Sequence, residues 1–134
     1  MADAVTSQTI QDGDRTAIMK FTNVSDGSGE SAVTKVDVSA LQTSSYNQTC
    51  TGVAIERIWW QCIGMRVQML WDATSNVICL ELGENQSGDS DFSTFGGLTN
   101  NSGSGKTGDL LFTTVGHTSG DSYSIVLQLN KSFT

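Results

Sequence analysis

The sequence predicts an all-β protein, folded as one antiparallel β-sandwich of the jelly-roll or immunoglobulin-like kind with about 7–8 strands. Three observations predict this. Apolar residues alternate with polar ones and do not recur at helical spacing, so the expected elements are strands. Stretches rich in Gly, Ser, Asn and Asp separate the alternating runs, as turns do between short strands. The chain has 134 residues, an ordinary size for one domain, and we expect residues 1–134 to form a single β domain.

The N-terminal third of the chain contains three candidate extended segments. Residues 1–11 are predicted to form an arm or a strand, and residues 16–22 carry apolar side chains at every second position. Residues 32–39 are predicted to be a half-buried strand in which Lys35 and Asp37 lie on the face opposite to the valines.

The central run 52–63 is apolar on both faces, which is typical of a strand in the middle of a packed structure. It contains the adjacent pair Trp59 and Trp60. Neighbouring strand residues point to opposite faces, so the two indoles cannot form one flat platform for a sugar. We expect at least one of them to pack in the core.

Four further runs are arranged in two pairs. Residues 65–71 and 76–82 are separated by a short polar linker, which indicates a hairpin. Residues 109–115 and 122–129 flank a Gly-containing turn, and in the second run apolar residues alternate regularly with polar or small ones. The sequence therefore predicts a second hairpin at the C-terminus.

Two segments are poor in apolar residues and are predicted to be loops, 25–31 and the long Gly/Ser-rich segment 83–108. Loops as long as the second are usually either binding loops or poorly ordered. Because it contains Phe92, Phe95 and Leu98, we expect part of it to pack onto other residues.

The charge of the chain argues against nucleic-acid binding. The formal net charge is −7, and the seven cationic residues are scattered without forming a run. Such a chain repels phosphate and lacks the basic patch on which nucleic-acid affinity depends. The N-terminus lacks the features of a secretory signal, and no apolar stretch is long enough for a membrane helix, so we expect no membrane partner and maturation in the cytoplasm.

No residues with a catalytic, cofactor-binding or metal-binding role are predicted, and we do not expect an enzyme. The three cysteines form no CxxC pair, so free thiols are expected instead of a zinc site. Segment 103–107 (GSGKT) resembles the end of a phosphate-binding loop, but Asn100 stands where the first glycine is required and a strand-like run follows. The single histidine, His117, has no nucleophile motif beside it and is expected to be a turn residue.

Three segments carry a resemblance to a known group of proteins: 4–9 (AVTSQT), 19–27 (MKFTNVSDG) and 116–127 (GHTSGDSYSIVL). They resemble segments of small virion structural proteins of tailed bacteriophages, especially phages of marine bacteria. The resemblance implies a capsid decoration, or cement, protein that binds the major capsid protein or other virion proteins in many copies or as a homo-oligomer. It also implies location in the virion, after assembly in the host cytoplasm. A head–tail connector or tail component is the alternative within this group.

A second alternative is a carbohydrate-binding β-sandwich that would hold glycans with Trp71 or Tyr46. For the virion role, contact residues are expected in the N-terminal arm and the long loop. The chain has no proline, so one common guard of exposed sheet edges is missing and a partner could cover such an edge instead. The predicted partner-contact residues are Val5, Thr6, Ser7, Gln8, Phe92, Phe95, Leu98 and Asn100.

Overall fold

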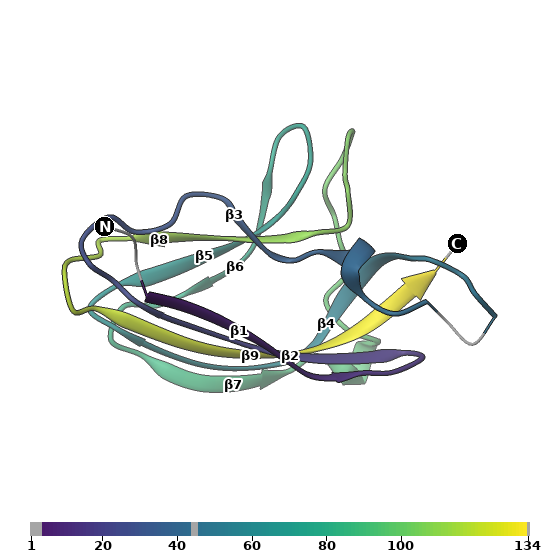
Figure 1. The fold of residues 1–134 in the computed structure, drawn as a ribbon, viewed down its shortest axis with the longest axis horizontal. Helices are drawn as coiled ribbons and strands as arrows, with labels where there is room; N and C mark the ends of the chain where they lie inside the picture. Colours follow the sequence, from purple (N-terminus) through teal and green to yellow (C-terminus); the bar gives the residue numbers. More distant parts are fainter. Residues whose placement is uncertain (1–3, 44–45, 134) are drawn as a thin grey trace.

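The computed structural model describes residues 4–43 and 46–133 and consists of two antiparallel sheets packed face to face (Figure 1). The five-stranded sheet has the order β1-β2-β9-β4-β7, and the four-stranded sheet has the order β3-β8-β5-β6. Two short 3₁₀ helices, η1 (Val38–Ala40) and η2 (Ser93–Phe95), lie between strands. The strands are β1 (Ala4–Asp12), β2 (Thr16–Val24), β3 (Val33–Val36), β4 (Cys50–Ile63), β5 (Arg66–Trp71), β6 (Val77–Leu82), β7 (Ser87–Asp91), β8 (Leu110–Val115) and β9 (Ser122–Phe133).

The strand order identifies which sandwich this is. With β1 set aside, the sheets read β2-β9-β4-β7 and β3-β8-β5-β6, so the chain passes from one sheet to the other at every connection from β2 onward except β5 to β6. This is the order of a jelly roll. The predicted all-β sandwich is therefore confirmed, with nine strands in the described part of the chain instead of 7–8.

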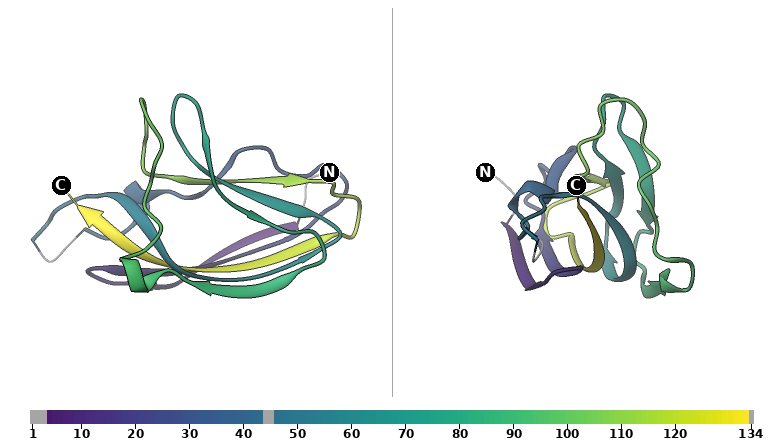
Figure 2. Two further views of the ribbon diagram at one scale, coloured as in Figure 1. Left: turned by 180° about the vertical axis from the view of Figure 1, so that it is seen from behind. Right: turned by 90° about the vertical axis from the view of Figure 1, so that its right-hand side faces the viewer.

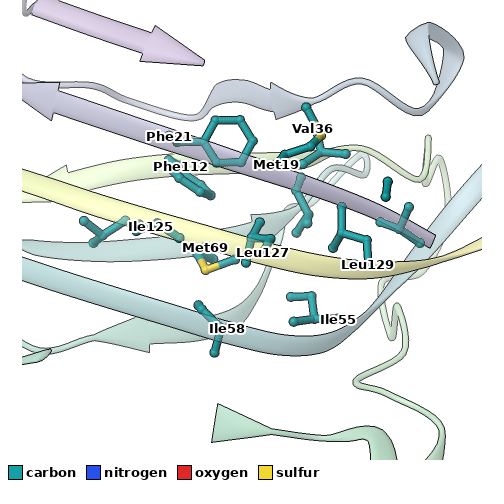
Figure 3. Close-up of a cluster of buried hydrophobic side chains, with 14 of the residues drawn as sticks. Met19, Phe21, Val36, Ile55, Ile58, Met69, Phe112, Ile125, Leu127 and Leu129 are labelled. Carbon is teal, nitrogen blue, oxygen red and sulfur yellow. The ribbon is translucent and has the colours of Figure 1, made fainter. Parts of the chain in front are cut away.

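The core lies between the two sheets and is built from the alternating residues that face inward (Figure 3). Phe112 of β8 is its aromatic centre: its ring contacts Phe21 at 5.3 Å and Tyr123 at 5.8 Å between centroids, both edge to face. Aromatic pairs prefer this geometry because ring edges are positive and ring faces negative. Trp71 at the end of β5 is completely buried in the same core.

The predicted C-terminal hairpin is wrong, whereas the hairpin of β5 and β6 is confirmed. β8 pairs with β3 and β5, while β9 pairs with β2 and β4, so residues 116–121 form an arch between the sheets. A hairpin and an arch have the same sequence pattern, two alternating runs around a short turn. Which of them forms depends on partners that are distant in the sequence.

The predicted long loop 83–108 is only partly a loop. β7 lies within it and pairs with β4, although its sequence, SGDSD, has no apolar residue to reveal it. The end of the segment runs alongside the β5–β6 turn, where Thr74 N donates to Ser104 O at 3.2 Å and Thr107 Oγ1 donates to Asp72 Oδ2 at 2.8 Å. Figure 2 shows these two loops rising side by side above the four-stranded sheet.

Lys35 is the residue whose predicted position differs most from its observed one. A register shift between Thr34 and Val36 forms a β-bulge opposite β8, and both Lys35 and Val36 are buried. A bulge adds one residue to a strand and so breaks the alternation from which Lys35 was expected to face solvent. β3 then ends at Val36, and Asp37 caps η1 by accepting from Ser39 N at 3.0 Å.

Candidate functional site

The first candidate contact surface is the outer edge of the five-stranded sheet. We call residues 5–11 of β1 the β1 edge; every one of them is exposed. Among described residues, β1 pairs only with β2, and even Val5 is 39% exposed. Side chains on both faces of this strand are thus in solvent, together with the backbone groups along its free side.

The β1 edge has few of the features that normally protect an exposed strand. Edge strands avoid unwanted pairing through charged side chains, proline, short length or bulges. Residues 5–11 contain neither a charge nor a proline, and the only irregularity is a register shift between Thr9 and Gln11. The strand therefore offers an uncharged template to which another extended segment could pair.

The second candidate surface is a hollow beside η2, which we call the Phe95 hollow. It has a volume of about 400 Å³. Phe95 is 64% exposed and Ile78 of β6 is 49% exposed, so two large apolar side chains lie open on this surface. The lining residues are Trp71, Ile78, Cys79, Phe95, Gly97, Leu98, Thr99 and Asn101.

Backbone hydrogen bonds to β4 hold this segment in place. Leu98 and Ile55 exchange two of them, at 2.8 and 3.0 Å, and Phe92 N donates to Glu56 O at 2.7 Å. Gly97 has a φ of 100° and lies so close to β4 that a β-carbon would come within 3.1 Å of the Ala54 side chain. Glycine is favoured here both by the positive φ and by the close approach, and the segment presents Phe95 outward.

The predicted contact residues form two separate groups. Val5, Thr6, Ser7 and Gln8 are exposed on β1. The other group is mixed: Phe95 is exposed, whereas Phe92 and Leu98 are partly buried and pack against the core.

The structure does not bring the two groups together, because β2, β9 and β4 lie between β1 and the bridge from Leu98 to Ile55. Asn100 lines a different hollow, with Thr51 and Lys106, and accepts a hydrogen bond from Ser102 N at 2.8 Å. Sequence reasoning did not select Ile78, because its exposure follows from the position of β6 at the edge of its sheet.

Trp71 cannot serve as the predicted sugar platform, because it is completely buried. Tyr46 is exposed. Of the adjacent tryptophans, Trp60 packs against the core, as expected for at least one of the pair, and Trp59 lies on the outer face of the five-stranded sheet.

One end of the sandwich contains a buried polar network. Glu30 forms an ion pair with Lys35 through Oε2, while its Oε1 accepts from Asn23 Nδ2 at 2.9 Å and from the Tyr123 hydroxyl at 2.6 Å. The backbone N–H of Glu30 donates to Thr114 Oγ1 at 2.9 Å. Hydrogen bonds of this kind satisfy a carboxylate that burial would otherwise destabilise.

His117 lies at the rim of this network. Its Nδ1 is 3.2 Å from Thr114 Oγ1, and its ring packs so closely on Gly29 that a β-carbon there would collide with it at 2.2 Å. The ring thus fixes the arch between β8 and β9 against the segment that precedes β3. This placement agrees with the expected role of a turn residue.

All three cysteines are free, and burial raises the pKa of each thiol, to about 11 for Cys62 and about 12 for Cys79. At neutral pH the thiols are protonated and react poorly, because the thiolate is the nucleophile. We expect iodoacetamide at pH 7.5 to leave all three unmodified in the folded protein and to modify all three in urea, as measured by intact mass. Labelling of Cys79 in the native protein as fast as in urea would contradict this.

The described residues contain neither a candidate metal site nor a helix that could span a membrane. No group of three or more His, Cys, Asp or Glu side chains within residues 4–43 and 46–133 is arranged to hold a metal ion. Among the same residues, no helix has both the length and the apolar character needed to cross a membrane.

Comparison with known proteins adds little to this geometry. No family model matches the chain, and no curated protein matches it. Among solved structures, a cupin superfamily protein from Desulfitobacterium hafniense is similar over 98% of this chain and 80% of its own, with 11% identity and a TM-score of 0.37. A likeness this distant says nothing about the chemistry of the present chain.

Proposed function

We propose that this chain is a structural protein of a bacteriophage virion, where it decorates the coat lattice and stabilises contacts between coat subunits. The observation that carries the proposal is the β1 edge, an uncharged strand exposed on both faces that the described part of the chain leaves uncovered. Added strands bind such edges through main-chain hydrogen bonds. A protein that kept this edge open in free solution would risk aggregation.

The Phe95 hollow supports the same role from the opposite side of the molecule. The β1 edge and the Phe95 hollow are separated by the width of the five-stranded sheet, so one copy can contact two neighbours at once. A standard interface buries on the order of 800 Å² of each partner. The described surface totals 6762 Å², which leaves room for two such contacts.

The resemblance of segments 4–9, 19–27 and 116–127 to small phage virion proteins directs the proposal to a phage particle. Jelly rolls occur in viral capsid proteins as well as in lectins and cupins. This analogy of fold is compatible with the role but does not decide it, since one fold serves many functions. A position at the neck or tail of the particle is the alternative. An image of the particle distinguishes the two roles: a decoration protein covers the whole coat, and a tail component forms a ring at one vertex.

The test adds charge to the β1 edge. Purified protein is added to particles of the encoding phage that were assembled without it, and the bound fraction is measured after sedimentation. Because lysine guards edge strands against pairing, we expect the double variant Val5→Lys, Ser7→Lys to bind about tenfold more weakly than the unmodified chain. Phe95→Asp is expected to weaken binding by a similar factor, since it places a charge in the apolar hollow.

The matched control is Ser119→Lys, which adds a cation at an exposed position of the arch between β8 and β9. It should bind like the unmodified chain, with an unchanged melting temperature in all variants. If the β1 and Phe95 variants bind as well as the unmodified chain, neither surface contributes to the contact. Absence of binding by the unmodified chain would reject the virion role itself.

A further inference from the structure

Beyond an assembly role, we propose that the outer face of the five-stranded sheet carries a binding site for a neutral saccharide, centred on Trp59. The site lies where β9, β4 and β7 run side by side (Figure 1), and β2 separates these strands from the β1 edge. It uses neither the β1 edge nor the Phe95 hollow, so it is independent of the proposed lattice contacts.

The strand register places the outward side chains in rows across the sheet. Trp59 of β4 lies between Val126 of β9 and Asp89 of β7. Two residues further along β4, the next outward row consists of Ser124, Gln61 and Ser87. Directly opposite residues in a sheet have β-carbons about 5 Å apart, so the second row forms a polar floor beside the Trp59 indole.

A shallow hollow of about 500 Å³ opens at this place. Pockets for small ligands span about 300–1,000 Å³. Its lining residues are Trp59, Trp60, Gln61, Ser87, Gly88, Asp89, Ser124 and Val126.

Arg57 occupies the other side of Trp59. Its guanidinium carbon lies 4.8 Å from the centre of the Trp59 ring, and Nη2 donates to Asp89 Oδ2 at 2.9 Å. Arg57 does not line the hollow. The cation therefore packs on the Trp59 ring and pairs with Asp89, while Trp59 itself lines the hollow beside the polar row.

This combination fits the chemistry of a neutral sugar. A pyranose ring presents C–H groups on one face, which pack on the apolar face of an aromatic ring. Its hydroxyl groups point outward in the ring plane and need both donors and acceptors. Gln61, Ser87 and Ser124 supply these, and no hydrogen bond to another described residue occupies their side chains.

A second protein chain fits the same hollow poorly. The centre of a protein interface is apolar and aromatic over a large area, whereas this hollow has a volume of only about 500 Å³ and places the polar side chains of Gln61, Ser87 and Ser124 beside Trp59. The one charged residue that lines the hollow is the acidic Asp89, and the whole chain carries a net charge of −7. Acidic saccharides are therefore expected to bind more weakly than neutral ones.

The experiment titrates the full chain with hexasaccharides of β-linked glucose, α-linked glucose, mannose and N-acetylglucosamine, and with a sulfated hexasaccharide as the acidic probe. Binding is followed by calorimetry and by tryptophan fluorescence, to which Trp59 contributes. We expect saturable binding of at least one neutral probe and at least about tenfold weaker binding by Trp59→Ala. Gln61→Ala should lose about three- to tenfold, the effect of one hydrogen bond.

The matched control is Phe95→Ala, which removes an exposed aromatic ring on a different surface and should leave the affinity within about twofold. Melting curves of all three variants show whether the fold is retained. The proposal is overturned if no neutral probe binds at about 10 mM, if the sulfated probe binds best, or if Trp59→Ala binds like the unmodified chain. Self-association that disappears in Trp59→Ala would identify the site as an interface between copies and would also overturn it.

Discussion

Replacing Lys35 with methionine is expected to lower the free energy of unfolding by about 3–5 kcal/mol, because it leaves the carboxylate of Glu30 buried without its counter-charge. The Lys35 and Glu30 side chains are only 3% and 6% exposed, so water cannot take the place of the missing ammonium group. Methionine retains most of the apolar stem of lysine, which separates the loss of charge from the creation of a cavity. Urea denaturation followed by the fluorescence of the buried Trp71 measures the effect.

Two further variants show whether charge burial is the cause. Glu30→Gln combined with Lys35→Met removes both charges, while the introduced amide oxygen can still accept from the Tyr123 hydroxyl, so the double variant should be more stable than Lys35→Met alone. Asp89→Ala breaks the ion pair with Arg57, in which the Arg57 and Asp89 side chains are 40% and 49% exposed, and should cost less than about 1 kcal/mol. A Lys35→Met variant no less stable than Asp89→Ala would refute charge burial as the cause.

The Glu30 network also shows where sequence reasoning fails. Strands such as β2 and β9 were predictable because one face is buried and the other is not, which imposes a period of two on the residues. A β-bulge is decided by pairing between β3 and β8, and one added residue is enough to turn Lys35 inward. No local pattern contains that information.

The sequence likewise did not show to which of the two sheets a strand belongs. The arch between β8 and β9 has the alternation and the Gly-containing turn of a hairpin. What separates the two strands is that Phe112 and Tyr123 face each other across the core, and this contact exists only once both sheets are assembled. β7 was missed for a different reason, since a strand without apolar residues is ordered by its neighbour β4 alone.

The candidate surfaces were partly predictable. The absence of proline indicated that a partner could cover an exposed sheet edge, and the N-terminal arm was among the expected contact elements; the structure leaves residues 5–11 of this arm exposed. Phe92, Phe95 and Leu98 were selected because apolar residues in a polar loop indicated that part of it packs onto other residues; Phe92 and Leu98 do so, whereas Phe95 is exposed. Its neighbour Ile78 and the row of Trp59 with Gln61 could not be selected, because both follow from strand order and register.

Lys131 holds the other end of the sandwich together, and its replacement by methionine is expected to cost about 3 kcal/mol. Its side chain is completely buried, and its three donors are all used. Nζ donates to Asp12 Oδ1 at 2.6 Å, to Gly13 O at 2.8 Å and to Gln42 O at 2.9 Å. One side chain of β9 thereby fixes the β1–β2 turn and the segment that follows η1.

Because β1 pairs only with β2 in the described structure, this anchor also decides how well the β1 edge is ordered. Lys131→Met should speed hydrogen exchange in β1 and the β1–β2 turn more than in β5 or β8, as measured by mass spectrometry. If the chain has the proposed virion role, Lys131→Met should also weaken its binding to phage particles, although no residue of the β1 edge is changed. Lys20→Met, on the exposed face of β2, is the control and should change stability by no more than about 0.5 kcal/mol. If Lys131→Met lowers global stability but leaves exchange in β1 unchanged, the pairing with β2 suffices to order the edge, and the anchor serves the turn alone.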